Sequence, residues 1–104
     1  AALVRNADLQ QRLARETGNI EDAVATAKAL LVVSPTNVRG HLALARSYSI
    51  GQNFKSATDT YQKLISLDND YTLPKREAAR IYYADNRYDL SHDTYLSIGG
   101  GDPE

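Results

Sequence analysis

The sequence contains no cysteine, no methionine and no tryptophan, and it has one phenylalanine and three prolines. Without cysteine the chain can form neither disulfide bonds nor thiolate metal sites. The cysteine content therefore does not indicate whether the protein occurs in an oxidising or a reducing compartment. Its apolar runs are too short for a membrane-spanning helix, and no signal peptide is visible. Because a complete primary translation product begins with methionine, we expect these residues to be a segment of a longer protein.

The composition is that of one small globular domain. The chain has 104 residues, of which 42% are hydrophobic and 24% are charged. A chain of this length can bury enough surface to fold without disulfides or metals. The formal charge of −1 argues against bulk attraction to nucleic acid or to acidic lipid.

The chain repeats itself at an interval of 34 residues, most clearly around residues 50–67. Apolar residues recur there at helical spacing, which predicts one apolar helix face. Shifting the pattern by one interval in either direction finds it again. The three sets are Phe54, Ala57, Tyr61, Leu64 and Leu67; Ile20, Ala23, Ala27 and Leu30; and Tyr88, Ser91, Tyr95 and Ile98. The helix before each set repeats too, so each unit is two helices and a turn.

Turn residues divide the chain into six predicted helices and no strand. We expect helices over 1–17, 20–33, 38–50 and 53–67, a fifth that has Pro74 in its first turn and runs to about 84, and a sixth over 88–98. Proline ends the second helix and fits the first turn of the fifth. Gly51 is expected to supply a positive φ, Asn53 to cap the fourth helix, and Asn86 to replace glycine in a left-handed turn. The expected turns lie near Gly18, Pro35, Gly51, Asn69 and Asn86.

The turn sequences TGNIEDA and GQNFKSA, followed by helices that end near VVSPTN and SLDND, resemble those of tetratricopeptide repeats. The resemblance implies an all-α solenoid of three antiparallel helix pairs in a right-handed superhelix. It also implies a single domain over 1–98, with repeats at about 4–37, 38–71 and 72–98, and a flexible tail or linker over 99–104. In this family the first helix of each pair lines a concave groove, and the second forms the convex back.

Several packing positions follow from this repeat. We expect Ala57 to be tightly packed between helices, and Tyr48, Tyr61, Tyr82, Tyr88 and Tyr95 to fill gaps in the core. In the first helix the expected inner residues are Leu3, Leu9 and Leu13. The last helix should have an open face, with Leu90, Tyr95 and the surface around Ile98 more exposed than Phe54 and Tyr61.

No pattern in the sequence indicates catalysis, a metal or a cofactor. The only imidazoles, His41 and His92, lie on different helices without a carboxylate cluster at ligand spacing, and we expect His41 to be a partly buried structural residue. The acidic pairs fall at helix starts, in turns or on outer surfaces. The terminal glycines lack the lysine and the following helix of a phosphate-binding loop. We therefore predict that the chain is not an enzyme.

The arginines are the most informative polar residues. Arg12, Arg46 and Arg80 recur at the repeat interval, as do Arg5 and Arg39, so a solenoid would stack them into two ladders on the first helices. These helices are net basic, whereas the rest of the chain is net acidic. The predicted binding groove comprises Arg5, Arg12, Arg39, Arg46 and Arg80, with Arg76 and Tyr83 on its rim. We expect Arg46 to contribute most. In the alternative interpretation these arginines are solvated or paired with Asp8, Glu16 and Glu77.

The predicted function is that of a non-catalytic protein-protein interaction module or scaffold. Its groove would bind an extended or helical, anionic partner segment through bidentate arginine contacts. One branch of the family clamps the carboxyl-terminal tails of heat-shock chaperones with basic residues and asparagines. The corresponding positions here are Asp8, Arg12, Ala43, Leu73 and Glu77. Only one of them is basic, so we do not expect an adaptor for chaperone tails of that type.

Two alternatives to this function stay open. The chain can be a scaffold segment of a bacterial secretion or envelope exopolysaccharide-export machine, where arrays of such repeats are frequent. An RNA-binding helical repeat is less favoured, because pentatricopeptide repeats have a 35-residue period and a strongly basic character. Both a cytoplasmic and a periplasmic location are compatible with the sequence.

Overall fold

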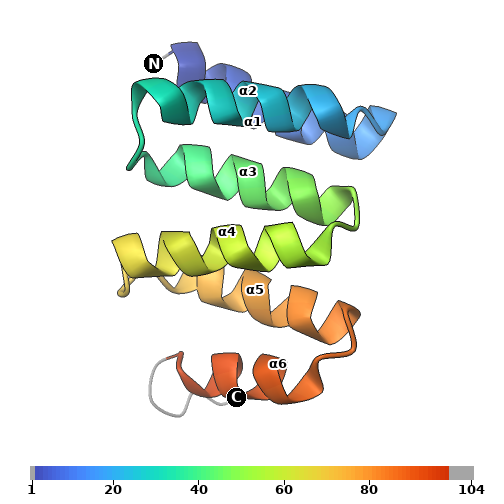
Figure 1. The fold of residues 1–104 in the computed structure, drawn as a ribbon, viewed down its shortest axis with the longest axis vertical. Coiled ribbons are helices and arrows are strands. Elements are labelled where there is room, and N and C mark those ends of the chain that lie inside the picture. The colour runs from blue at the N-terminus through green and yellow to red at the C-terminus, as the bar shows by residue number, and fades with distance from the viewer. Residues whose placement is uncertain (1, 99–104) are drawn as a thin grey trace.

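The computed structural model describes residues 2–98, which form six α-helices and no strand. The helices are α1 (Ala2–Thr17), α2 (Ile20–Val33), α3 (Val38–Ile50), α4 (Phe54–Leu67), α5 (Thr72–Ala84) and α6 (Tyr88–Leu96). Each helix packs on the next one along the chain, and α1 also packs on α3. Figure 1 shows the resulting stack, with the N-terminus at one end and α6 at the other. The predicted all-α helical-repeat fold is confirmed.

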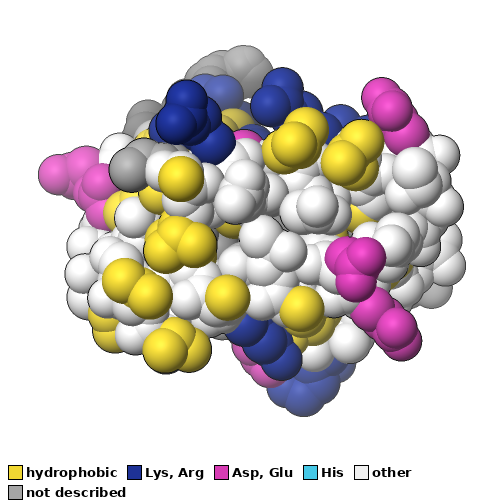
Figure 2. Space-filling view, turned by 90° about the horizontal axis from the view of Figure 1, so that it is seen from above, with side chains coloured by type: hydrophobic (Ala, Val, Ile, Leu, Met, Phe, Trp, Pro, Cys, Tyr) yellow, Lys and Arg dark blue, Asp and Glu magenta, His cyan; other side chains and the backbone are white. Residues whose placement is uncertain are grey.

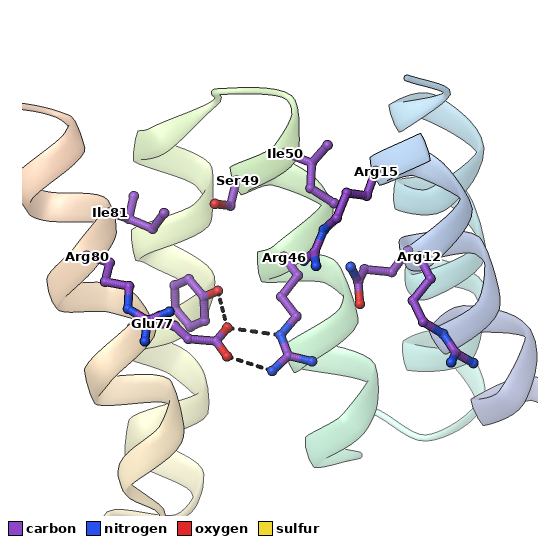
Figure 3. A pocket seen from close by; sticks show the side chains of 10 residues that line it. Arg12, Arg15, Arg46, Ser49, Ile50, Glu77, Arg80 and Ile81 are labelled. Atoms are coloured by element: carbon purple, nitrogen blue, oxygen red, sulfur yellow. Dashed lines mark hydrogen bonds and ion pairs between the residues drawn. The ribbon is translucent and has the colours of Figure 1, made fainter. Parts of the chain in front are cut away.

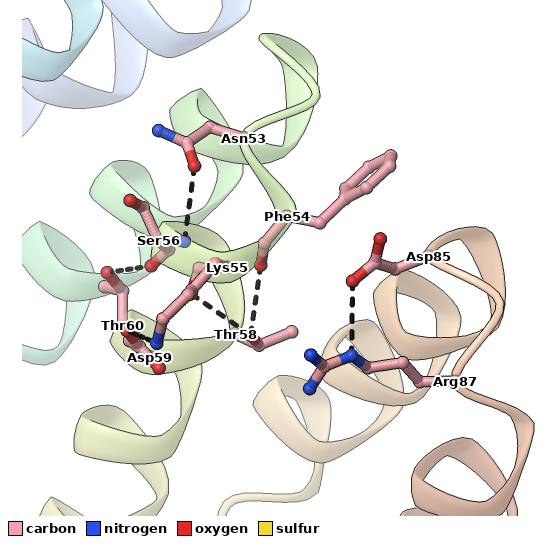
Figure 4. Close-up of polar contacts among 9 residues, drawn as sticks. All are labelled: Asn53, Phe54, Lys55, Ser56, Thr58, Asp59, Thr60, Asp85 and Arg87. Carbon is pink, nitrogen blue, oxygen red and sulfur yellow. Dashed lines mark hydrogen bonds and ion pairs between the residues drawn. The ribbon is translucent and has the colours of Figure 1, made fainter.

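Asparagine side chains begin three of the helices. The amide of Asp22 donates to the side chain of Asn19, that of Gly40 to Asn37, and that of Ser56 to Asn53. Each bond satisfies a backbone donor that has no partner within the helix. Figure 4 shows the cap at Asn53, together with threonine hydroxyls that donate to carbonyls one turn earlier in α4. The predicted cap at Asn53 is confirmed.

Each turn within a repeat contains one residue with a left-handed backbone conformation. Gly18, Gln52 and Asn86 have φ values of 77°, 61° and 63°, and they are spaced by the repeat interval. Asn86 was the predicted left-handed residue, but the expectation for Gly51 was wrong, because its φ is −78°. Gly51 is needed for space instead: a Cβ there would lie 3.0 Å from Cγ2 of Ile20, which belongs to the preceding repeat.

Two clusters of buried apolar side chains form the core. One lies between α3, α4 and α5 and contains Leu42, Ala45, Ala57, Tyr61, Leu64, Ala78 and Tyr82. The other joins α1, α2 and α3 and contains Ala7, Ala27, Leu30, Ala43 and Leu44. Tyr48 is half-buried and packs against both clusters. Ala57 is fully buried, as predicted.

The inner face of α1 differs from the prediction. The predicted residues Leu3, Leu9 and Leu13 are exposed, and the buried residues are Ala7, Gln11 and Ala14. The repeat explains this correction, because Gln11 occupies the position of the buried residues Ala45 and Ala79. The register of the repeat therefore explains why Gln11 is inside. It does not explain the exposure of Leu9 and Leu13, because the same positions in α3 are the buried residues Ala43 and Ser47; among the described residues, no helix precedes α1 to cover them as α2 covers α3.

The last helix is shorter than predicted, and its aromatic residues are more open. It ends at Leu96 rather than Ile98. Tyr88 and Tyr95 are exposed instead of filling the core, because no later helix covers them among the described residues. Leu90 and Tyr95 are more exposed than Tyr61, as expected, but Ile98 is buried at the position that Leu30 and Leu64 occupy in the other repeats. The predicted tail over 99–104 lies outside the described residues.

Candidate functional site

The first helices α1, α3 and α5 contribute most of the walls of a polar cleft of about 490 Å³. Each of these helices contributes an arginine from the ladder predicted at the repeat interval: Arg12, Arg46 and Arg80. Arg15 lies one turn after Arg12, while Ile50 and Ile81 give the cleft an apolar part. Figure 3 shows these side chains on their separate helices, with Arg46 and Glu77 pointing toward each other and Arg80 beside Glu77. The structure therefore brings this predicted ladder into one cleft.

The centre of the cleft is an internal ion pair. Arg46 donates two hydrogen bonds to the carboxylate of Glu77, at 3.0 Å from Nε and 2.6 Å from Nη2. The hydroxyl of Tyr61 donates to the same carboxylate at 2.7 Å. The pair joins α3 to α5 (Figure 3). Tyr61 belongs to α4 and reaches the pair through its hydrogen bond to Glu77. For Arg46 the structure thus shows the alternative interpretation, in which the guanidinium is paired within the chain.

The contacts among Arg46, Glu77 and Tyr61 shift the pKa values of all three groups. Burial alone would raise the pKa of Glu77, but the hydrogen bonds from Arg46 and Tyr61 and the nearby positive charges lower it below its usual value. The hydrogen bond to Glu77 raises the pKa of Arg46. Burial, together with the adjacent carboxylate, raises the pKa of the Tyr61 hydroxyl. Glu77 is therefore ionised and Tyr61 neutral at pH 7, so the centre of the cleft carries no net charge.

The arginines around this neutral centre are exposed. Within residues 2–98, no carboxylate forms an ion pair with Arg12, Arg15 or Arg80. Their three positive charges surround the cleft, and guanidinium groups bind carboxylates in a bidentate geometry. The arrangement is suited to an anionic group that enters between α1 and α5.

A second cleft of about 400 Å³ shares Gln11, Arg12 and Arg46 with the first and adds Asp8 and Arg39. Arg39 forms an ion pair with Asp8, which joins α3 to α1. Arg39 is therefore also paired within the chain, although its side chain is largely exposed.

The other predicted site residues lie apart from these two clefts. Arg5 and Arg76 are exposed and line neither of them. Tyr83 is exposed, and its ring packs edge-on against Tyr88 with 5.0 Å between the ring centroids. These residues remain predictions, because the structure does not bring them together with the ladder of Arg12, Arg46 and Arg80.

Sequence reasoning missed Arg15 and the apolar part of the cleft. A signal for Arg15 was present, because it lies three residues after Arg12 and so on the same side of the helix. It also occupies the repeat position of Ser49, which lines the cleft, and of Tyr83, which was predicted. Ile50 and Ile81 have no comparable signal, since they occupy different positions of the repeat.

His41 has the structural role that its position predicted. It is buried, and its Nε2 lies 2.8 Å from the carbonyl oxygen of Pro35, in the loop between α2 and α3. Since a carbonyl accepts hydrogen bonds only, Nε2 carries the proton. His41 therefore holds the inter-repeat loop against α3.

Comparison by sequence finds no matching family model and no matching curated protein. Comparison by structure finds the type III secretion translocator chaperone SycD of Yersinia enterocolitica, solved as an alternative dimer. The TM-score is 0.79 at 16% sequence identity, over 93% of this chain and 74% of the other. The chain therefore shares the helical-repeat fold of a secretion chaperone. Within residues 2–98, no helix has both the length and the apolar character that crossing a bilayer requires.

Proposed function

We propose that this chain is a non-catalytic protein-binding module that holds an anionic partner segment in the cleft between its first helices. The observation that carries the proposal is that Arg12, Arg15 and Arg80 line one cleft around a centre that is already neutral. Like charges that line one cleft without counter-charges repel each other, and an anionic ligand relieves that repulsion. The structural neighbour SycD is a chaperone, which supports a protein partner.

The walls of the cleft indicate the chemistry of the partner. Three guanidinium groups favour Asp, Glu or a terminal carboxylate, while Ile50 and Ile81 favour an apolar side chain next to it. An extended segment of ten residues spans roughly 33 Å, which is comparable to the 38 Å length of the stack. An acidic segment interrupted by leucines therefore fits both the charge and the length of the groove.

A direct test uses a labelled ten-residue peptide of glutamate and leucine, with the same peptide carrying lysine for glutamate as the comparison. Fluorescence anisotropy should show binding of the acidic peptide only. Arg12→Glu and Arg80→Glu should each weaken it at least about tenfold, or about 1.4 kcal/mol. Lys28→Glu makes the same change of charge on an exposed position of α2 outside the cleft, and should leave the affinity unchanged. Equal weakening by all three variants would indicate bulk charge and reject the cleft.

Two other functions remain as proposals. The similarity to a secretion chaperone favours a place in a bacterial secretion or export machine, with the chain as a scaffold segment. In that case, crosslinking in the producing cells should recover membrane-associated components of such a machine. RNA binding is less favoured, and a salt-dependent shift with oligo-uridine would support it.

A further inference from the structure

The centre of the arginine cleft differs in charge from its flanks. Arg46 has Glu77 as a bidentate partner, whereas no carboxylate within residues 2–98 pairs with Arg12 or Arg80. In Figure 3, Arg46 and Glu77 lie between Arg12 and Arg80. Figure 2 views the stack from above and shows Lys and Arg side chains grouped at two edges of the molecule rather than spread over it. A ligand in the cleft therefore meets a local charge that is positive at the flanks and neutral between them.

The repeat supplies an internal carboxylate to Arg46 but not to Arg12. The step along the sequence that leads from Arg46 to Glu77 leads from Arg12 to Ala43. Ala43 is 2% exposed and belongs to an apolar cluster, so it offers no counter-charge. The neutral centre is thus a feature of one junction and not of the repeat.

Glu77 accepts hydrogen bonds from two side chains, and a ligand carboxylate that replaced it would have to break all of them. Arg46 donates to it at 3.0 Å and 2.6 Å, and Tyr61 donates at 2.7 Å. Tyr61 is 2% exposed, so displacement of Glu77 would leave a buried hydroxyl without its partner, which is costly. We therefore expect the centre of the cleft to keep its internal carboxylate when a ligand enters.

The guanidinium of Arg46 still has donors for an uncharged acceptor. The bonds to Glu77 use its Nε and one N–H of Nη2, which leaves both N–H groups of Nη1 and the second one of Nη2. A backbone carbonyl or a side-chain amide can accept from these groups without bringing a second negative charge near Glu77. A carboxylate at the same place would be attracted by Arg46 and repelled by Glu77, so that the two effects offset each other.

We propose that Glu77 determines the specificity of the cleft, which selects partner segments with acidic residues toward both ends and an uncharged stretch between them. This inference rests on the proposed function, because it requires an acidic segment in the cleft. One acidic end pairs with Arg12 and Arg15 of α1, and the other pairs with Arg80 of α5. In the stretch between them, a carbonyl oxygen accepts from Arg46.

Two labelled peptides of identical composition and net charge test the proposal. The flank-acid peptide is EELLQQLLEE, and the centre-acid peptide is QLLEEEELLQ. In fluorescence anisotropy, the wild type should bind the flank-acid peptide at least about fivefold more tightly, which is the scale of one unit charge at about 4 Å in water. This comparison needs no substitution, so it does not depend on the stability of a variant.

Two variants assign the preference to Glu77. Glu77→Gln keeps an oxygen that can accept from Tyr61 and leaves the positive charge of Arg46 uncompensated. It should therefore lower the preference for the flank-acid peptide at least about fivefold, by the same charge effect. The matched control is Arg46→Gln combined with Glu77→Gln, which makes the centre neutral again and should restore the wild-type preference. Circular dichroism should show wild-type helical content for both variants.

The possible results separate this inference from the proposed function. If the wild type binds both peptides with equal affinity, the cleft still binds acidic segments but the role of Glu77 is overturned. A preference that is unchanged in Glu77→Gln, or that the double variant does not restore, also overturns that role. If the wild type binds neither peptide, the proposed function and this inference are both rejected.

Discussion

The two junctions between repeats make the same helix contact with different chemistry. At the first junction, Ala27 of α2 and Ala43 of α3 belong to one apolar cluster. At the second junction the same two positions are Tyr61 and Glu77, which are joined by a hydrogen bond. A pair of small residues and a pair of large polar residues thus occupy the same place in equivalent helix contacts. The comparison shows that the repeat conserves the helix arrangement and not the interaction that stabilises it.

The first junction depends on close approach of its helices. Gly40 of α3 faces Leu30 and Leu31 of α2 without room for a side chain. The second junction depends on a polar network, in which Glu77 accepts hydrogen bonds from two side chains. We therefore expect added bulk to destabilise the first junction and loss of charge to destabilise the second. The predictions below are ordered from the largest expected effect to the smallest.

The largest effect is expected at the second junction. Glu77→Ala leaves the guanidinium of Arg46 and the hydroxyl of Tyr61 without their partner in a partly buried position. The free energy of unfolding in urea should fall by about 3 kcal/mol. Replacing both charged residues, as Glu77→Leu with Arg46→Met, should recover most of this loss, because the unpaired charge is then removed. A loss below about 0.5 kcal/mol for Glu77→Ala would contradict the role of the network.

Added bulk should disturb the first junction. In Gly40→Val, the new Cβ would lie 2.9 Å from Leu31 and 3.0 Å from Leu30, so these side chains must move. Overpacking of this kind costs about 2 kcal/mol, which thermal and urea unfolding would detect. Adding Leu31→Ala should restore part of the stability by making room. Wild-type stability of Gly40→Val alone would show that α2 and α3 do not depend on close packing at Gly40.

The second junction should also be the more sensitive to acid. The pKa of Glu77 is lowered in the fold, so its ionised form stabilises the folded state. This contribution is complete above the ordinary pKa of about 4.5 and is lost as the pH falls through the lower folded value. The stability advantage of the wild type over Glu77→Gln should therefore shrink between pH 6 and pH 3. An advantage that does not change with pH would mean that the charge of Glu77 contributes nothing.

The smallest effect is expected from the ion pair at the first junction. The side chain of Arg39 is 64% exposed, whereas that of Arg46 is 32% exposed. A double-mutant cycle of Arg39→Ala and Asp8→Ala should give a coupling energy below about 0.5 kcal/mol. The corresponding cycle of Arg46 and Glu77 should give a clearly larger value. Equal coupling energies would remove the difference between the two junctions.

Features set by the period of the sequence could be predicted well. Five of the six helices end where the turn residues indicated, and Asn53 caps α4 as expected. These features depend on neighbouring residues, because helix caps and turns are local structures. The stacking of Arg12, Arg46 and Arg80 into one cleft followed from the same period.

Features set by the ends and by contacts between helices could not be predicted. The burial of Leu9 depends on whether another helix covers α1, which its own pattern does not determine. The pairing of Arg46 with Glu77 was one of two open interpretations. The residues are 31 positions apart, and their distance depends on how α3 and α5 lie relative to each other. Whether an arginine binds a ligand or a neighbouring helix is decided by that geometry.

The position of Tyr48 has a consequence for how the stack opens. Because this side chain packs against both core clusters, loss of either cluster removes part of the support of the other. Helices α1 to α5 should therefore exchange their protected amide hydrogens in one cooperative event. Helix α6 has Ser91 as its buried residue and lies outside both clusters, so its amides should exchange first and separately.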